Sequence, residues 1–252
     1  MSEAVKTYEG WYAYHDFRKI DWTRWKSLSP EKRDEAIREL VEVLREFASV
    51  EESRGGSFGQ YAVLGHKADL LFIHFRPTLE ALNEVKWRFD KTAFADVTSA
   101  PTSFISVVEL SAYTVPPGTD PMSDPAFRER LQPSMPKAKY VCFYPMNKRR
   151  NLSDNWYMLP MEERRKMMKS HGMIGRSYAG KVRQIVTGSI GLDDWEWGVS
   201  LFADDPLHFK KIVTEMRFDE VSARFGEFGP FYIGARLTEE GLVSLLKEQV
   251  KG

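Results

Sequence analysis

Apolar positions along the chain follow two periods, one typical of helices and one typical of strands. The first long segment with the helical period begins after Ser29, an expected N-cap, with Pro30 at the first helical position. Its apolar residues recur every three or four positions: Ile37, Leu40, Leu44 and Phe47. Shorter runs rich in aromatic and β-branched residues, bounded by glycine, proline and polar residues, predict strands.

These elements occur in the same order in both halves of the chain. In the first half we expect a strand, a helix, two strands, a helix and a strand over 11–17, 30–47, 61–64, 70–75, the residues after Pro77, and 104–111. In the second half we expect the same series over 140–147, 160–170, 182–187, 195–202, the residues after Pro206, and 231–237. This order is that of a ferredoxin-like unit.

The two halves also align residue by residue. Arg88-Phe89-Asp90 matches Arg217-Phe218-Asp219 at an offset of 129 (217 − 88), and Tyr14 matches Tyr144 at an offset of 130 (144 − 14). A repeat of this length indicates two copies of one domain-sized unit. We therefore predict an α+β fold of duplicated ferredoxin-like units with antiparallel sheets, which form a dimeric α+β barrel. The copies are predicted over 1–112 and 140–252, with a Pro-rich linker or lid over 113–139.

Composition and charge exclude several classes of protein. Lys+Arg and Asp+Glu both number 36, so the formal net charge of zero argues against a general binder of nucleic acid or membrane surfaces. The single cysteine, Cys142, excludes an intrachain disulfide. The N-terminus lacks the pattern of a signal peptide, and no apolar run reaches the roughly 20 residues of a membrane span. We expect a cytoplasmic protein.

One histidine differs in context from the others. His171 aligns with Val41 of the first half, shares a helix face with Met167 and Met168, and is followed by Gly172. A lone histidine on an apolar face is commonly a hydrogen-bonded core residue. As a metal ligand it suits haem, because the porphyrin supplies the other four nitrogens. The remaining histidines are interpreted as structural or surface residues: His15, His66, His74 and His208.

The stretch YPMNKRR places Tyr144, Met146 and Lys148 on one face of a strand. The segment is either a sheet edge blunted by charge or a phenol beside a site for carboxylates. Further along, alternation in KVRQIVTG puts Arg183 and Gln184 on opposite faces of a strand. The pattern leaves open which of the two faces inward.

Three stretches, YPMNKRR, KSHGMIGRSYAGKVRQIVTG and RFDEVSARFGEFGPFYIG, resemble the coproheme decarboxylases of the chlorite-dismutase-like superfamily. The resemblance implies a homopentamer that binds iron coproporphyrin III, called coproheme, as both substrate and prosthetic group. Hydrogen peroxide would drive oxidative decarboxylation of two propionates to vinyls through a tyrosyl radical, giving haem b and CO2 in haem biosynthesis. It leaves room for a transient contact with the preceding ferrochelatase.

The resemblance also implies roles for individual residues. His171 matches the proximal iron ligand, Tyr144 the redox-active tyrosine, and Lys148 the lysine that holds a propionate and handles its proton. Gln184 matches the distal glutamine, whereas chlorite dismutases have an arginine in that role. The remaining matches are contacts to the porphyrin carboxylates: Arg130, Pro145, Met146, Asn147 and Ser222.

Two other functions compete with this interpretation. A chlorite dismutase is the nearest enzyme alternative, and an inward-facing Arg183 would favour it. A non-catalytic haem carrier or sensor is the alternative from a different class. Such a protein would need His171 and the basic residues but would have no use for Tyr144.

Overall fold

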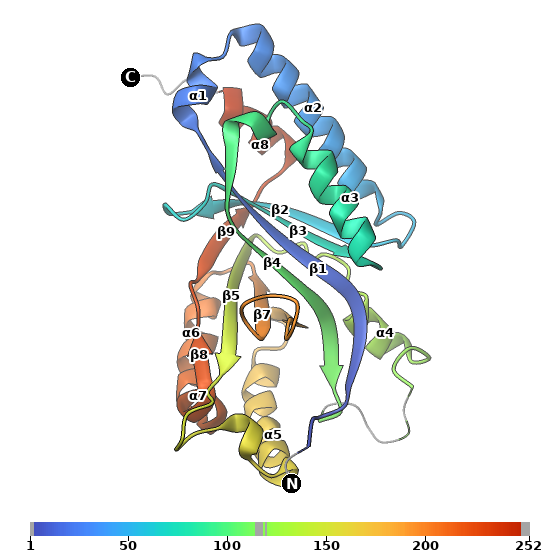
Figure 1. Ribbon diagram of the computed structural model, residues 1–252, viewed down its shortest axis with the longest axis vertical. Helices are drawn as coiled ribbons and strands as arrows, with labels where there is room; N and C mark the ends of the chain where they lie inside the picture. Colours follow the sequence, from blue (N-terminus) through green and yellow to red (C-terminus); the bar gives the residue numbers. More distant parts are fainter. Residues whose placement is uncertain (1–2, 114–117, 119, 248–252) are drawn as a thin grey trace. The chain divides into compact units, whose positions relative to one another are not determined.

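The computed structural model describes residues 3–113, 118 and 120–247. The chain divides into two units, each assembled from separate segments (Figure 1). The second-copy unit comprises residues 1–11 and 105–233, and the first-copy unit comprises residues 12–104 and 234–252. Residues 234–247 thus belong to the unit that is built mainly from the first repeat. Linker residues 114–117 and 119 lie outside the described residues.

The first-copy unit has an antiparallel sheet covered by helices. Its strands are β1 (Thr7–Ile20), β2 (Ser57–Leu64) and β3 (Leu70–Arg76), with β3 between the other two. Its helices are α1 (Trp22–Ser27), α2 (Pro30–Ser49), α3 (Leu79–Asp90) and α8 (Glu239–Lys247). In Figure 1, α2 and α3 lie side by side, where Arg88 pairs with Glu46 at 2.9 Å.

The core of this unit confirms the predicted helical stripe. Ser29 accepts a hydrogen bond from the backbone N–H of Lys32 and so caps α2 as expected. All four stripe residues are buried against the sheet: Ile37, Leu40, Leu44 and Phe47. Leu242 and Leu246 of α8 join the same cluster, which holds α8 in this unit.

The second-copy unit repeats the plan with additional elements. Its strands include β5 (Tyr140–Lys148), β6 (Arg183–Gly188), β7 (Trp197–Ala203) and β8 (Gly226–Phe228), where β7 pairs antiparallel with both β5 and β6. Its helices are α4 (Pro125–Leu131), α5 (Met161–Ser177), α6 (Leu207–Arg217) and α7 (Glu220–Phe225). Strand β1 and the last strands of the repeats, β4 (Thr98–Ser111) and β9 (Tyr232–Arg236), contribute residues to both units.

These observations confirm the α+β class, the antiparallel pairing and the order of elements in both copies. Two expectations were wrong in detail. The helix predicted to end near residue 170 continues past Gly172 and Gly175 to Ser177. Its contacts with α6 and α7 stabilise this last part of the helix. The linker also contains a helix, α4, in which Pro125 occupies the first turn and Asp124 caps it. No helix among the described residues is long and apolar enough to cross a membrane.

Candidate functional site

The centre of the candidate site is His171, on the inner face of α5. This face also carries Arg164 and Met167, both buried, whereas the His171 side chain keeps 23% of its surface exposed. Its Nδ1 lies 2.8 Å from Oδ2 of Asp219, a carboxylate only 2% exposed. A buried carboxylate therefore fixes the orientation of a partly open imidazole.

Asp219 is held in place by the start of a helix. It caps α7, and its Oδ2 also accepts the backbone N–H of Ser222 at 3.4 Å. Ser222 was predicted to contact a ligand carboxylate; in the structure it is buried and its amide supports Asp219. Sequence reasoning missed Asp219, although the repeated Arg-Phe-Asp motif marked the position as one that both copies share.

The electrostatics of His171 favour a neutral ring. Burial is the largest effect and lowers the pKa of His171, and the charge of Lys148 adds to this, whereas the hydrogen bond and charge of Asp219 act in the opposite direction. A neutral imidazole that donates Nδ1–H to a carboxylate has its lone pair on Nε2, the form that binds metals. Among the described residues, no group of three or more His, Cys, Asp or Glu side chains could hold a metal ion. A metal ion bound at Nε2 would therefore need its other ligands from a group bound together with it, because the described residues do not supply them.

Lys148, at the end of β5, is a buried cation. Its Nζ lies 5.1 Å from the ring centroid of Trp156, and its backbone N–H donates to Glu196 at 2.7 Å. Burial lowers the pKa of Lys148 to about 8, although the negative charges of Asp219 and Glu196 act to raise it. None of the ion pairs within the described part of the chain involves this ammonium. A buried ammonium without a close counter-ion favours binding of an anion.

Tyr144 precedes Lys148 by four residues on the same strand, β5. Its ring is buried and stacks on Phe231, with centroids 4.5 Å apart. Burial raises the pKa of Tyr144, and Arg217 opposes this effect only in part. The side chain is therefore a neutral phenol at physiological pH.

Hydrogen bonds and packing fix the three residues between Tyr144 and Lys148. The carbonyl of Pro145 accepts from Gly229 at 2.9 Å, and the side-chain oxygen of Asn147 accepts the N–H of Glu196 at 2.8 Å. Met146 is half-buried and packs against the cluster that contains Tyr144. The segment is thus a rigid strand end rather than a loose basic loop.

The structure resolves which residue of β6 faces α5. A Cβ built on Gly175, one turn after His171, would lie 3.9 Å from Oε1 of Gln184. Arg183 points away and pairs with Glu129 of α4 at 3.3 Å. Gln184 is therefore the polar side chain on the side of α5, the helix that carries His171.

Arg130 is the predicted site residue that stays apart. It is exposed on α4, with its guanidinium 5.8 Å from the Phe127 ring centroid. Within the described residues no hydrogen bond or ion pair joins it to Tyr144 or Lys148. Its helix is anchored by Leu131, whose carbonyl lies so close to Gly10 that a Cβ there would overlap it.

Comparison with known proteins identifies the family. The sequence model described as "Chlorite dismutase" matches residues 23–237. The chain belongs to the chlorite dismutase family. A structure described as a heme-binding protein from Thermus thermophilus matches at 53% identity with a TM-score of 0.94, covering 98% of this chain and 99% of the other.

More distant members of the chlorite dismutase family share the fold. A variant of chlorite dismutase from Candidatus Nitrospira defluvii is 19% identical, with a TM-score of 0.77 over 95% of this chain and 96% of the other. A second variant of that enzyme is 18% identical, with a TM-score of 0.77 and the same coverage. At these identities the likeness concerns the architecture alone.

In this member of the chlorite dismutase family, the first copy contains a closed counterpart of the site. Arg18 occupies the position of Lys148 at the offset of 130 (148 − 18). It is bound by Asp16 at 2.8 Å and by Asp90, the counterpart of Asp219, at 3.0 Å. The cation of the first copy is neutralised within the protein, whereas Lys148 is not.

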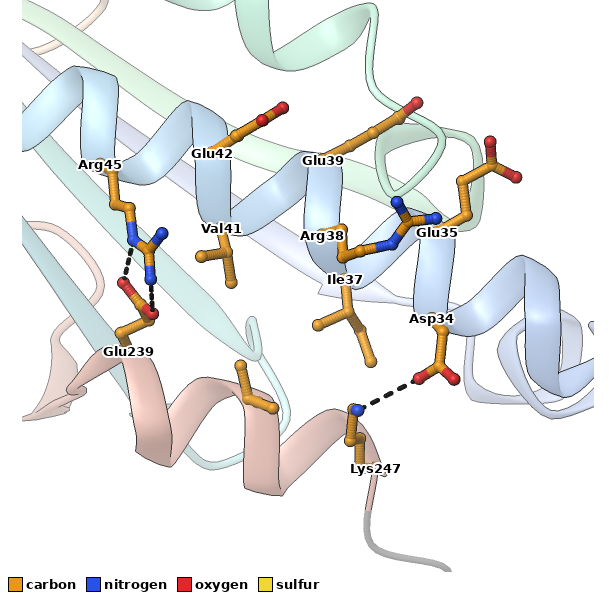
Figure 2. A pocket seen from close by; sticks show the side chains of 11 residues that line it. Asp34, Glu35, Ile37, Arg38, Glu39, Val41, Glu42, Arg45, Glu239 and Lys247 are labelled. Carbon is orange, nitrogen blue, oxygen red and sulfur yellow. Dashed lines mark hydrogen bonds and ion pairs between the residues drawn. The ribbon is translucent and has the colours of Figure 1, made fainter.

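A helix also covers the corresponding face of α2. Figure 2 shows Val41, the counterpart of His171, on the floor of a groove of about 700 Å³ between α2 and α8. Arg45 binds Glu239 at 2.6 Å and Lys247 binds Asp34 at 3.2 Å across this groove. These ion pairs hold α8 over the face that, in α5, carries the open histidine. The histidine, the buried lysine and the tyrosine of the candidate site therefore have no matching set on this face of the first copy.

Proposed function

We propose that this protein is a coproheme decarboxylase, which uses hydrogen peroxide to convert two propionates of iron coproporphyrin III into vinyls. Each turnover removes CO2 and two hydrogen equivalents from one propionate and reduces one peroxide to two waters. The product is haem b. Family membership supports a haem-dependent oxidoreductase, and the residues of the second copy favour this particular reaction.

The orientation of β6 carries the proposal. Gln184 lies on the side of His171, and Arg183 is engaged by Glu129 on the other side. A neutral amide neither donates nor accepts a full proton near pH 7, so it is unsuited to peroxidase-type acid–base chemistry. An arginine in this place would instead favour reactions of small anions such as chlorite.

The residues present fit an iron porphyrin. His171 offers one nitrogen, fixed by Asp219, and a macrocycle would supply the four ligands that the described residues lack. The heme-binding protein from Thermus thermophilus, at 53% identity, supports the same group here. When bound, coproheme supplies the iron centre that activates peroxide and also the propionates that react.

The protein's own residues position and oxidise the substrate. Lys148 holds a propionate by its charge, and the strand end from Tyr144 to Lys148 holds a second carboxylate. Carboxylate contacts by Ser222 and Arg130 stay predictions from the resemblance. Tyr144 gives up an electron and a proton, and the resulting radical takes a hydrogen atom from the propionate β-carbon. Loss of a second electron and of CO2 then leaves the vinyl group. Assembly as a homopentamer, contact with a ferrochelatase and a cytoplasmic location remain predictions from the resemblance.

Peroxide titration of the coproheme complex tests the function. Purified protein mixed with ferric coproporphyrin III should show stepwise loss of two carboxyl groups by mass spectrometry, through a monovinyl species. Tight binding without a change in porphyrin mass would contradict the proposal and would favour a carrier or sensor. Release of O2 from chlorite under the same conditions would favour a chlorite dismutase.

Lys148 predicts how coproheme affinity depends on pH. Because the pKa of Lys148 in the free protein is lowered to about 8, the ammonium loses its proton as the pH rises through that value. A bound carboxylate raises this pKa again, so affinity should fall by up to about tenfold per pH unit above 8. The titratable groups that face Lys148 are Asp219, Glu196 and His171. They are unchanged when Lys148 is replaced, so a difference in pH dependence would come from Lys148 itself.

The measurement is the dissociation constant of coproheme between about pH 6.5 and 9.5. Lys148→Met, which keeps the length of the side chain but removes the charge, should bind more weakly below pH 8 and show a smaller dependence on pH. An unchanged dependence in this variant would show that another group binds the carboxylate.

A further inference from the structure

We propose that Tyr178 and Glu215 form a redox relay that carries an oxidising equivalent from Tyr144 to a surface cavity, where a small anionic reductant removes it. The inference rests on the proposed function, because peroxide and coproheme must first oxidise Tyr144. It concerns what happens to the enzyme after both propionates have reacted, when a further peroxide finds no substrate.

The ring of Tyr178 lies in the same apolar cluster as Tyr144. Tyr178 ends α5, directly after Ser177, and its side chain is buried. The buried members of the cluster link β5 and β7 to α6: Cys142, Tyr144, Tyr178, Val199, Leu201, Ala203, Phe209 and Ile212. Both phenols thus belong to one packed cluster, which is the route that we propose for the electron.

The hydroxyl of Tyr178 has a built-in proton acceptor. It donates to Oε1 of Glu215 on α6 at 2.5 Å. A phenol that loses an electron must also lose its proton, and this bond lets the carboxylate accept the proton without movement of either residue. Tyr144 differs, since no hydrogen bond from its hydroxyl to a carboxylate is present among the described residues.

The polar end of Tyr178 opens into a cavity of about 310 Å³. Its lining is polar and carries two lysines and a histidine: Ser177, Tyr178, Lys181, His208, Lys211 and Glu215. Lys181 and Lys211 take part in no ion pair within the described parts of the chain. Two lysines stand against the single carboxylate of Glu215 in this lining, so the cavity carries a net positive charge that favours an anion.

The steps balance in atoms and electrons. Tyr178 passes an electron to the Tyr144 radical and its proton to Glu215, while Tyr144 takes back the proton that it released on oxidation and becomes a phenol again. An anionic one-electron donor of the ascorbate type, held by Lys181 and Lys211, then reduces the Tyr178 radical. Glu215 returns the proton, and the reductant leaves as its one-electron-oxidised form.

Radical trapping locates the oxidised residue. The coproheme complex is given excess peroxide with a nitrone spin trap, and adducts are mapped by peptide mass spectrometry. We expect an adduct on Tyr178 in the unmodified protein and none on Tyr178 in Tyr144→Phe. An adduct that persists on Tyr178 in Tyr144→Phe would overturn the relay. The porphyrin mass is read in the same sample, so intact propionates in the unmodified protein count separately against the proposed function.

The reductant step is tested with ascorbate. In Tyr178→Phe and Glu215→Gln, peroxide-driven ascorbate oxidation should fall by about 10²-fold relative to decarboxylation in the same preparation, the effect expected for loss of a positioned proton acceptor. Tyr140→Phe, which removes another phenol packed on the same cluster, is the matched control and should keep ascorbate oxidation. Equal losses in this control, or no loss in Tyr178→Phe, would refute the assignment.

Two further readouts separate the relay from a structural role. Lys211→Met should raise the KM for ascorbate but not for neutral hydroquinone, and equal changes for both reductants would count against the anion site. In the protein without porphyrin, the strongly hydrogen-bonded Tyr178 hydroxyl should give a low-field proton resonance that is lost in Glu215→Gln. Persistence of that resonance in the variant would rule out Glu215 as the proton acceptor.

Discussion

Tyr144→Phe is expected to bind coproheme normally and to form haem b at least about 10²-fold more slowly than the unmodified protein, because it lacks the oxidisable phenol. The substitution removes a single oxygen. The ring keeps its stack on Phe231 at 4.5 Å, so the strand end that holds the propionates should not move. Affinity and turnover are therefore expected to separate, as they should for a residue that acts only in the chemical step.

The first copy provides the matched control for this experiment. Tyr14 aligns with Tyr144, is also buried, and has a pKa raised mainly by burial. It is surrounded by Asp16 and Arg18 rather than by an open site. Tyr14→Phe should leave haem b formation unchanged, with both variants followed by absorbance and porphyrin mass spectrometry. Normal turnover in Tyr144→Phe would remove the tyrosyl radical from the mechanism.

Local patterns predicted most of the elements, because each is encoded in a short window. The apolar stripe from Ile37 to Phe47 and the cap at Ser29 are examples, since helix period and capping depend on residues a few positions apart. The added helix α4 was missed because proline was read as a breaker, whereas Pro125 occupies the one helical turn that tolerates it.

The site was harder to predict from the sequence than the elements, because it depends on contacts between residues that are far apart in the chain. Asp219 is 48 positions from His171, and only the fold places its carboxylate against Nδ1. The choice between Arg183 and Gln184 likewise depended on where α4 and α5 lie, because alternation separates two faces without saying which is inside. The closing of α2 by α8 is equally invisible in a local pattern, since it joins residues that are far apart in the chain.

The duplicated fold explains why one copy could acquire this chemistry. In the first copy the cation Arg18 is neutralised by Asp16 and Asp90, so its charges stabilise the fold. In the second copy Asp219, the counterpart of Asp90, contacts His171 instead of the cation. Lys148 therefore has no ion-pair partner among the described residues. The position of the structural ion pair in the first copy is thus taken in the second copy by two groups that we propose bind the ligand.

His171→Ala is expected to abolish iron ligation and to reduce coproheme affinity by more than the roughly 10–100-fold that loss of an outer-shell partner costs. The change removes the imidazole that Asp219 orients. The ferric absorption spectrum should become that of a five-coordinate or solvent-bound iron without imidazole. Added imidazole should restore part of the spectrum, which distinguishes lost ligation from misfolding. An unchanged spectrum would refute the assignment of His171.

Asp219→Asn tests the carboxylate separately from its structural role. Asparagine is as good an N-cap as aspartate, so α7 should keep its start and the free energy of unfolding should change by less than about 1 kcal/mol. What is lost is the negative charge against Nδ1, which makes the imidazole a weaker donor to iron. Affinity should fall about 10–100-fold, and the iron–histidine stretching frequency of the ferrous complex should decrease.

Asp90→Asn, the same change in the first copy, is the control for this experiment. It weakens the ion pair with Arg18 but lies in the unit whose histidine position is occupied by Val41, so neither affinity nor the stretching frequency should respond. A stretching frequency that is unchanged in Asp219→Asn would mean that the carboxylate only positions the ring. A loss of affinity that is equal in both variants would mean that the effect is one of general stability.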